Sequence, residues 1–324
     1  MLDFSDILSN PNINMQMFIG QANATAGITT GEWKTWVKPR GVKFVYMIGV
    51  GGGASGGTGN NTASTSGGGA GGGSGAQSNL LIPAMFLPDI LYIQAGLGGA
   101  GLTTSGSVPV AGTPTYVAIE PWTTLAAQLT VLFANPGTVG GAAPTTTAGG
   151  VVGAAAAAAT IANMPLAGKG ATQFFAGLAG SAGGPNNGVG VALTPFTAPT
   201  GIMVMGGTGG GGCNGGTASP GGLITGAGFG DNYPTIPGGT VPGGSTASQP
   251  GSGGRIVKPW QHYGGAGGGG NTANGGGTAR PGNGGPGAPG CGGGGGGGSS
   301  NTATVNSIAS PGDGGPGFVY IYSW

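Results

Sequence analysis

Two stretches of the chain alternate side chains with the period of two that is typical of a β-strand. Residues 42–50 (VKFVYMIGV) place Val42, Phe44, Tyr46 and Ile48 on one face. Residues 318–322 (FVYIY) place Phe318, Tyr320 and Tyr322 on one face, shortly before the C-terminal residue Trp324. Both are rich in β-branched and aromatic residues, so they predict two strands. Because they bracket the rest of the chain, we expect them to share an antiparallel sheet near the termini.

Weaker patterns predict further elements. Residues 90–95 and 115–119 are expected to be strands, and Pro39-Arg40-Gly41 is a turn signal before residue 42. Residues 122–133 (WTTLAAQLTVLF) fit either a short helix or a strand. The alanine run at 153–163 is the best helix candidate, because alanine has the highest helix propensity, although it lacks caps. Residues 1–30 are mildly polar and are interpreted as an N-terminal arm or docking segment.

Between these elements the chain is dominated by glycine. It contains 84 glycines and 24 prolines, together a third of its 324 residues, but only 5% charged residues. Glycine loses more backbone entropy on folding than any other residue and has no side chain to bury. An ordered state therefore requires extensive backbone hydrogen bonding. Helices of the polyproline-II type, with three residues per turn, can supply it when they pack side by side.

Four glycine tracts have the composition that such packing requires. They are GGGAGGGSG, GGTGGGGCNGG, GGAGGGG and PGCGGGGGGGSS, at residues 67–75, 206–216, 264–270 and 289–300. Each tract is expected to form one rod of a polyglycine-II bundle, joined to the next by loops at the bundle ends. The alternative is that the tracts are flexible linkers. The predicted fold class is therefore mostly β and irregular, with little α-helix.

A dinucleotide-binding turn is not expected, although Gly49 begins a G-x-G-x-x-A match. That site needs a helix after the turn and an acidic residue about 20 positions further on. The chain continues instead as SGGTGNNTASTSGGG from Ser55, and position 69 is glycine. We expect these glycines to face other backbone rather than a phosphate.

Charge and cysteine content limit the expected partners. A net charge of +1 gives no field that would attract nucleic acid or an anionic membrane. No apolar run reaches the ~18 residues that span a bilayer, and the first residues (MLDFSDILSN) lack the pattern of a secretory signal. Cys213 and Cys291 are more consistent with two free thiols than with one disulfide. We expect no cofactor and no metal.

The order of the motifs resembles the glycine-rich domain of bacteriophage tail fibres and related virion proteins. Trp33 precedes the W-x-x-P-x-G turn of Trp36, Pro39 and Gly41, which leads into KFVYMIGVGGGASGG. LPDILYIQAGLGGAG, GTPTYVAI and the segment at 171–184 follow, and the chain closes on GGPGFVYIYSW. The resemblance covers residues 31–324, with a larger insertion at about 120–165 than is usual for the family. It implies a non-enzymatic protein of the virion surface that recognises a receptor through distal loops.

The resemblance also implies the partners, which are other virion proteins, a host-surface receptor of protein or glycan, and further copies in a homo-oligomer such as a trimer. Two alternatives stay open: a capsid-decoration or assembly protein without a receptor role, and a bacterial glycine-rich surface or filament protein. An enzyme is not expected, because the single histidine and the scattered acids form no catalytic pattern.

Loop aromatics and polar residues are the binding candidates, since function concentrates in loops. One cluster is Trp260, His262 and Tyr263, and the other is Phe229, Asp231, Asn232 and Tyr233. The alternative is that these residues cap the bundle and shield it from water. A structural role is expected for Trp33, Trp36, Phe44, Tyr46, Phe318, Tyr320 and Trp324.

Overall fold

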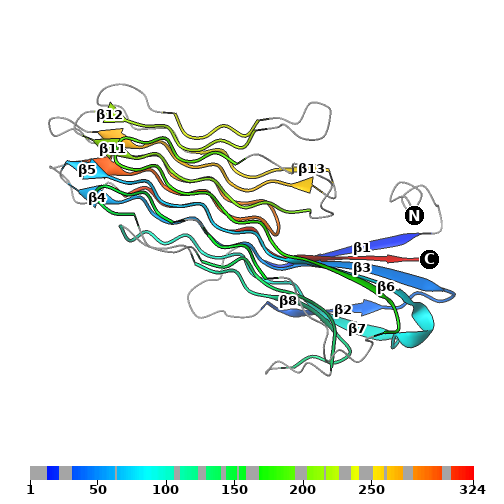
Figure 1. Cartoon of the computed structure of the whole chain (residues 1–324). Helices are drawn as coiled ribbons and strands as arrows, with labels where there is room; N and C mark the ends of the chain where they lie inside the picture. Colours follow the sequence, from blue (N-terminus) through cyan, green and yellow to red (C-terminus); the bar gives the residue numbers. More distant parts are fainter. Residues whose placement is uncertain are drawn as a thin grey trace.

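A computed structural model describes most of the chain. The described residues are 13–21, 31–62, 64–105, 110–122, 129–139, 144–151, 153–157, 168–193, 203–214, 217–225, 235–240, 251–258, 261–272, 280–300 and 308–324. The structure is mostly β and irregular, as the sequence predicts, and 2% of it is helical. Two sheets lie at one end, and long parallel and antiparallel rods extend from them to the opposite end (Figure 1).

The chain termini meet in a five-stranded antiparallel sheet. Its order is β1 (Asn14–Ile19), β17 (Phe318–Ser323), β3 (Phe44–Val50), β6 (Gln77–Pro83) and β10 (Ala171–Phe175). β17 pairs with β3, with Tyr320 opposite Ile48. The two aromatic strands therefore share one sheet, as expected. β1 adds a strand within the predicted N-terminal arm, and the sequence did not predict it.

A four-stranded antiparallel sheet packs against the first one. Its order is β2 (Trp33–Val37), β7 (Ile90–Gln94), β8 (Thr115–Ala118) and β9 (Thr130–Ala134). A 3-10 turn, η1 (Ala84–Phe86), follows β6 at the outer end. The core between the two sheets is apolar and closed to solvent. It consists of Trp36, Val45, Met47, Leu80, Ile82, Ala84, Leu87, Leu91, Ile93, Val117, Val131, Leu132, Val319 and Ile321.

Aromatic residues line the other face of the terminal sheet. Phe318 is fully buried, and its ring centroid lies 5.2 Å from that of Tyr320. Tyr320 is in turn 6.2 Å from Tyr322. This row packs in one apolar cluster with Met203 and Cys291 of neighbouring rods. The sheet thus connects the sandwich core on one face to the glycine bundle on the other.

The glycine tracts form rods that pair through backbone hydrogen bonds at every third residue. Ala54, Gly57 and Asn60 donate their N–H groups to the carbonyls of Gly73, Ala70 and Gly67, at 2.9, 2.8 and 2.9 Å. A step of three residues between bonds to one neighbour is the repeat of a three-residue helix of the polyproline-II type. The described rods are 51–60, 67–76, 95–101, 110–114, 135–139, 147–151, 153–157, 176–184, 188–193, 203–212, 219–224, 235–240, 251–255, 263–270, 280–288, 291–298 and 308–317.

Rod 291–298 shows how a central rod is held by its neighbours. Its consecutive amides donate in turn to rods 203–212, 51–60 and 280–288, at the carbonyls of Met205, Ala54 and Gly285. Its carbonyls accept from three further rods. The amides of Gly72, Gly265 and Gly312 donate to the carbonyls of Gly293, Gly292 and Gly294, at distances between 2.8 and 2.9 Å. Six neighbours surround this rod, and its backbone groups are satisfied without any side chain.

Close packing explains why these positions are glycine. A Cβ atom added to Gly53, Gly56 or Gly59 would lie 1.9 to 2.0 Å from a carbonyl oxygen of rod 291–298. Contacts below 3.0 Å do not occur for real Cβ atoms, so these sites admit only hydrogen. The segment with the dinucleotide-like match therefore faces other backbone, as the sequence predicts.

Buried serine and threonine hydroxyls add hydrogen bonds between rods. Thr208 Oγ1 accepts from the amide of Gly267 at 2.8 Å and donates to the carbonyl of Gly222 at 2.6 Å, beside the direct backbone bond from Gly267 to Gly222 at 3.2 Å. Ser181 Oγ likewise accepts from the amide of Gly209 and donates to the carbonyl of Val191. A buried hydroxyl thus supplements the backbone bonds on both sides.

One expectation is corrected, and one open alternative is decided for the described residues. The described part of the helix candidate, residues 153–157, is not helical but forms a rod, in which the amide of Gly153 donates to Gly71 at 3.2 Å. The hydrogen bonds between rods outweigh the α-helix propensity of alanine, which is only a weak preference. The ambiguous segment 122–133 contains β9 from Thr130, so its described C-terminal part is a strand.

Candidate functional site

The rods bring several short strands together at the end opposite the two sheets (Figure 1). Rod 51–60 runs into β4 (Asn61–Thr62), and β5 (Thr65–Ser66) opens the returning rod. Rods 203–212, 263–270 and 291–298 run in parallel into β11 (Cys213–Asn214), β15 (Asn271–Thr272) and β16 (Ser299–Ser300). β12 (Thr217–Ala218) pairs with β11. Because these rods lie side by side along one direction, their ends lie together on one surface.

This surface, called the polar end below, is defined by the residues of those six strands. They are Asn61, Thr62, Thr65, Ser66, Cys213, Asn214, Thr217, Ala218, Asn271, Thr272, Ser299 and Ser300. All but Cys213 and Ala218 are asparagine, serine or threonine, and none is charged. The strands form two small sheets, in the orders β12-β11-β5 and β15-β16-β4, that contact each other.

Hydrogen bonds between neighbouring segments of the chain order the polar end. Ser66 Oγ, which is buried, donates to the carbonyl of Ser299 at 2.6 Å and accepts from the amide of Thr62 at 3.1 Å. Asn271 Nδ2 donates to the carbonyl of Arg280 at 3.1 Å. Thr217 is exposed, and Asn61, Thr62, Thr65 and Asn214 are half-buried. Asn271, Ser299 and Ser300 are buried, so the exposed and half-buried residues form the accessible part of the polar end. The surface therefore presents neutral donors and acceptors on a backbone that is fixed from beneath.

Such a surface suits recognition by hydrogen bonding. Neutral amides and hydroxyls on ordered backbone bind sugars or polar peptide groups by hydrogen bonding. The one thiol among them, Cys213, is inaccessible, and burial raises its pKa to about 11. Burial raises the pKa of Cys291, the other free cysteine, to about 12. Neither thiol ionises near neutral pH, so neither is an activated nucleophile.

The described members of the first loop cluster, His262 and Tyr263, do not contribute to the polar end. His262 and Tyr263 lie at the opposite end, where β13 (Ile256–Lys258) pairs with β14 (Gln261–His262). His262 is fully buried, its Nδ1 lies 2.9 Å from the carbonyl of Pro289, and its ring packs 4.9 Å from that of Phe318. Tyr263 is also buried. These two residues cap rods and are not an exposed binding loop, which corrects that hypothesis.

The other members of those clusters are not placed. Trp260, Phe229, Asp231, Asn232 and Tyr233 lie outside the described residues. Their assignment as binding residues stays a prediction.

The residues expected to be structural lie in or beside the two sheets. Trp36 is 1% exposed in the sandwich core, and the Trp33 ring meets that of Trp122 edge-on at 4.9 Å. Four more of these residues, Tyr46, Phe318, Tyr320 and Trp324, belong to the apolar cluster on the side of the five-stranded sheet that faces the bundle. Phe44 differs from the expectation, because it is 42% exposed even though it stacks on Trp324.

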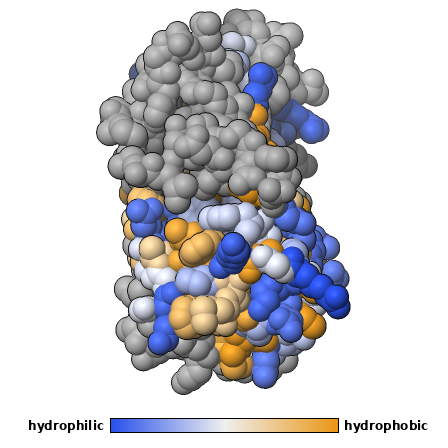
Figure 2. Space-filling view, turned by 90° about the vertical axis from the view of Figure 1, so that its right-hand side faces the viewer, coloured by the Kyte–Doolittle hydropathy of each residue, from blue (hydrophilic) through white to orange (hydrophobic). Residues whose placement is uncertain are grey.

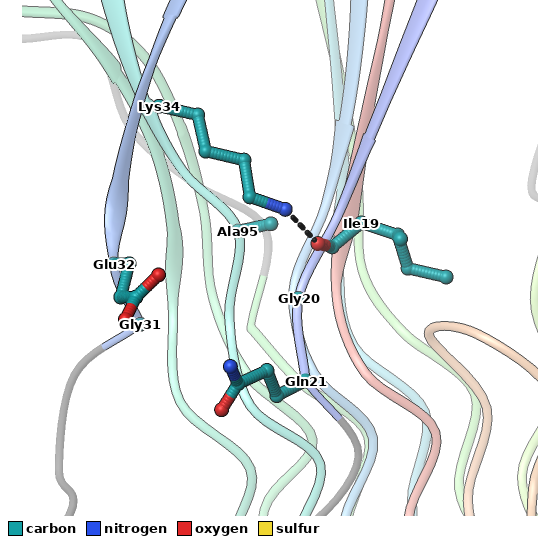
Figure 3. A pocket seen from close by; sticks show the side chains of 7 residues that line it. All are labelled: Ile19, Gly20, Gln21, Gly31, Glu32, Lys34 and Ala95. Atoms are coloured by element: carbon teal, nitrogen blue, oxygen red, sulfur yellow. Dashed lines mark hydrogen bonds between the residues drawn. The ribbon is translucent and has the colours of Figure 1, made fainter.

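A small pocket lies between β1 and β2 at the sheet end (Figure 3). The ammonium group of Lys34 reaches across it and donates to the carbonyl of Ile19 at 2.9 Å. This bond ties the edge strand β1 to the second sheet. The lining residues are Ile19, Gly20, Gln21, Gly31, Glu32, Lys34 and Ala95.

Metal sites and membrane spans are absent from the part of the chain that the structure describes. Among those residues, no group of three or more histidine, cysteine, aspartate or glutamate side chains could hold a metal ion. No helix within the described ranges has the length and hydrophobicity to cross a membrane. Comparison with known proteins finds neither a family model nor a curated protein that matches this chain.

Proposed function

We propose that this chain is a non-enzymatic structural protein of a bacteriophage virion, a tail-fibre or adhesin component that contacts the host surface. The observation that carries the proposal is the placement of the polar end. The bundle holds neutral asparagine, serine and threonine residues at the end farthest from the sheet that contains β1 and β17. A protein attached through its sheet end would present the polar end outward.

The bundle itself supports this role. Its rods are held to one another by backbone bonds, so sequence changes at the exposed positions of the polar end leave the scaffold intact. An adhesin needs that separation, because the recognition surface must vary while the support stays constant. The expected ligands are neutral polar groups, such as the hydroxyls of a surface glycan, since none of the strands of the polar end carries a charge.

Labelling of intact particles tests the proposed location. An antibody against the full chain, detected with gold in electron micrographs of purified phage particles, should mark the tail or its fibres. Gold spread evenly over the capsid would replace the adhesin proposal with the capsid-decoration alternative. Particles without any gold would contradict a virion role.

Binding to cells tests the contact. Fluorescently labelled full chain should bind a subset of strains in a panel of bacteria. The substitution Thr217→Trp, on an exposed residue of the polar end, should weaken that binding about tenfold or more. The matched control is Val189→Trp on the flank of the bundle, where the side chain is 55% exposed, and it should bind as the unmodified chain does. Equal effects of the two substitutions would exclude the polar end as the contact surface.

A further inference from the structure

The sheet end carries a group of exposed apolar side chains that the proposed function does not use. They occupy adjacent strand ends and η1, and Figure 2 views the molecule from this side. Val37 and Ile90 are cross-strand partners, and Phe44 pairs with Pro83, directly before η1. This surface, called the tip patch below, consists of Val37, Phe44, Met85, Phe86 and Ile90, exposed by 62%, 42%, 82%, 40% and 42%. Several large apolar side chains exposed at one end of a protein mark an interaction site.

Basic residues surround the tip patch. Arg40 and Lys43 are exposed in the turn and strand beside Phe44, and the Lys169 ammonium lies 5.6 Å from the centroid of the Phe86 ring. Lys38 is also here, but it is engaged with the Asp89 carboxylate at 3.1 Å and with the carbonyl of Leu87 at 2.8 Å. Four of the eight basic residues of the chain thus lie around the patch. Asp89, the acidic residue beside them, is paired.

These charges decide which occupant fits. In a two-fold contact between copies of this chain, the same patch meets itself, so its cations would face one another. Clusters of about four to eight basic residues recognise an anionic membrane surface. Only three basic residues surround this patch in addition to Lys38, which is ion-paired. A protein segment with apolar side chains beside carboxylates matches both the apolar group and its basic rim.

We propose that the tip patch is a docking surface for an acidic, apolar segment of another protein. Met85 and Phe86 supply the apolar anchor, and Arg40, Lys43 and Lys169 pair with carboxylates of the partner. The interaction does not depend on what the polar end binds. It assigns the two ends of the bundle different chemistry, with charge-assisted attachment at the sheets and neutral recognition at the far end.

Selection from a random peptide display library tests the proposal with partner segments of any sequence. The full chain is immobilised, and the enriched peptides are synthesised and titrated by fluorescence anisotropy. We expect them to combine aspartate or glutamate with leucine, methionine or phenylalanine. Their affinity should fall about tenfold or more for Arg40→Glu/Lys43→Glu and for Met85→Ser, which alters an 82% exposed side chain. The control Arg255→Glu/Arg280→Glu changes the net charge equally at exposed residues elsewhere and should change affinity less than about twofold.

Three outcomes would overturn the proposal. The first is enrichment of peptides without acidic residues, or affinities that the Arg40→Glu/Lys43→Glu chain retains. The second is binding of vesicles containing about a third phosphatidylglycerol that depends on Arg40 and Lys43 while no peptide binds, which would identify a lipid surface. The third is self-association in sedimentation that Met85→Ser abolishes, which would identify a second copy as the occupant.

Discussion

Replacement of one hydrogen atom by a methyl group in the centre of the bundle should destabilise the protein strongly. In Gly294→Ala, the new Cβ would lie 2.0 Å from the carbonyl oxygen of Ala266, about 1 Å closer than real Cβ atoms approach. Rods 291–298 and 263–270 must therefore separate by about that distance. Two bonds join these rods on either side of this point, from Gly265 to Gly292 and from Gly268 to Gly295, and each is 2.9 Å long.

The magnitude follows from those bonds. A shift of about 1 Å lengthens each 2.9 Å bond beyond the 3.5 Å limit, and the two losses in a buried site leave polar groups unsatisfied. At about 1–3 kcal/mol for each lost bond, the free energy of unfolding should fall by roughly 2–6 kcal/mol. The entropy that alanine removes from the unfolded chain offsets only about 0.4–1 kcal/mol of this.

A matched glycine on the surface of the bundle provides the control. A Cβ at Gly253 would meet Pro286 at 3.4 Å, an ordinary contact, and the backbone there is not in the left-handed region. Gly253→Ala should therefore change the free energy of unfolding by less than about 1 kcal/mol. Urea unfolding followed by tryptophan fluorescence, with the slope unchanged, measures both variants. If Gly294→Ala is as stable as Gly253→Ala, the close-packed rods do not exist.

The remaining predictions concern the buried hydroxyl and acidic groups. Thr208→Val removes the hydroxyl that bridges Gly267 and Gly222 and should lower the free energy of unfolding by about 1–3 kcal/mol. Thr208→Ser keeps the hydroxyl and should lower it less. Equal values for the two variants in urea titrations would refute the bridging role. Burial raises the pKa of Tyr322 from 10 to about 12 and that of Cys291 from 9 to about 12. The unfolded chain therefore loses these protons at lower pH than the folded one, so stability should be constant below pH about 9 and fall as pH rises toward 12. A urea midpoint that stays constant across that range would contradict this burial.

Several strands and four of the rods could be predicted from local patterns, because each depends on one repeating feature. Alternation at residues 42–50 and 318–322 identified β3 and β17, and the four glycine tracts identified rods. β1 was missed, since NMQMFI mixes polar residues and methionine and acquires its strand form only by pairing with β17. The alanines at 153–157 were misassigned, because propensity describes an isolated helix and not a rod among neighbours.

The polar end could not be predicted for a different reason. Each of its strands is two residues long, too short to show a period, and the strands meet only because distant rods end together. A usable signal does exist in hindsight. The tracts that end at Gly212, Gly270 and Gly298 are followed directly by the pairs CN, NT and SS. A glycine tract followed directly by a pair of small, mostly polar residues therefore marks where a rod ends on the common surface.

Hydrogen exchange of the amides of residues 292–298 tests the central claim, that the glycine tracts are packed rods, most directly. All seven amides donate to carbonyls of neighbouring rods, in a repeating order of three neighbours. They should exchange together, at least about 10⁴-fold more slowly than free peptide, which corresponds to roughly 5.5 kcal/mol of opening free energy. Exchange of these amides at the rate of an unstructured chain would show that the tracts are flexible linkers and would contradict the bundle.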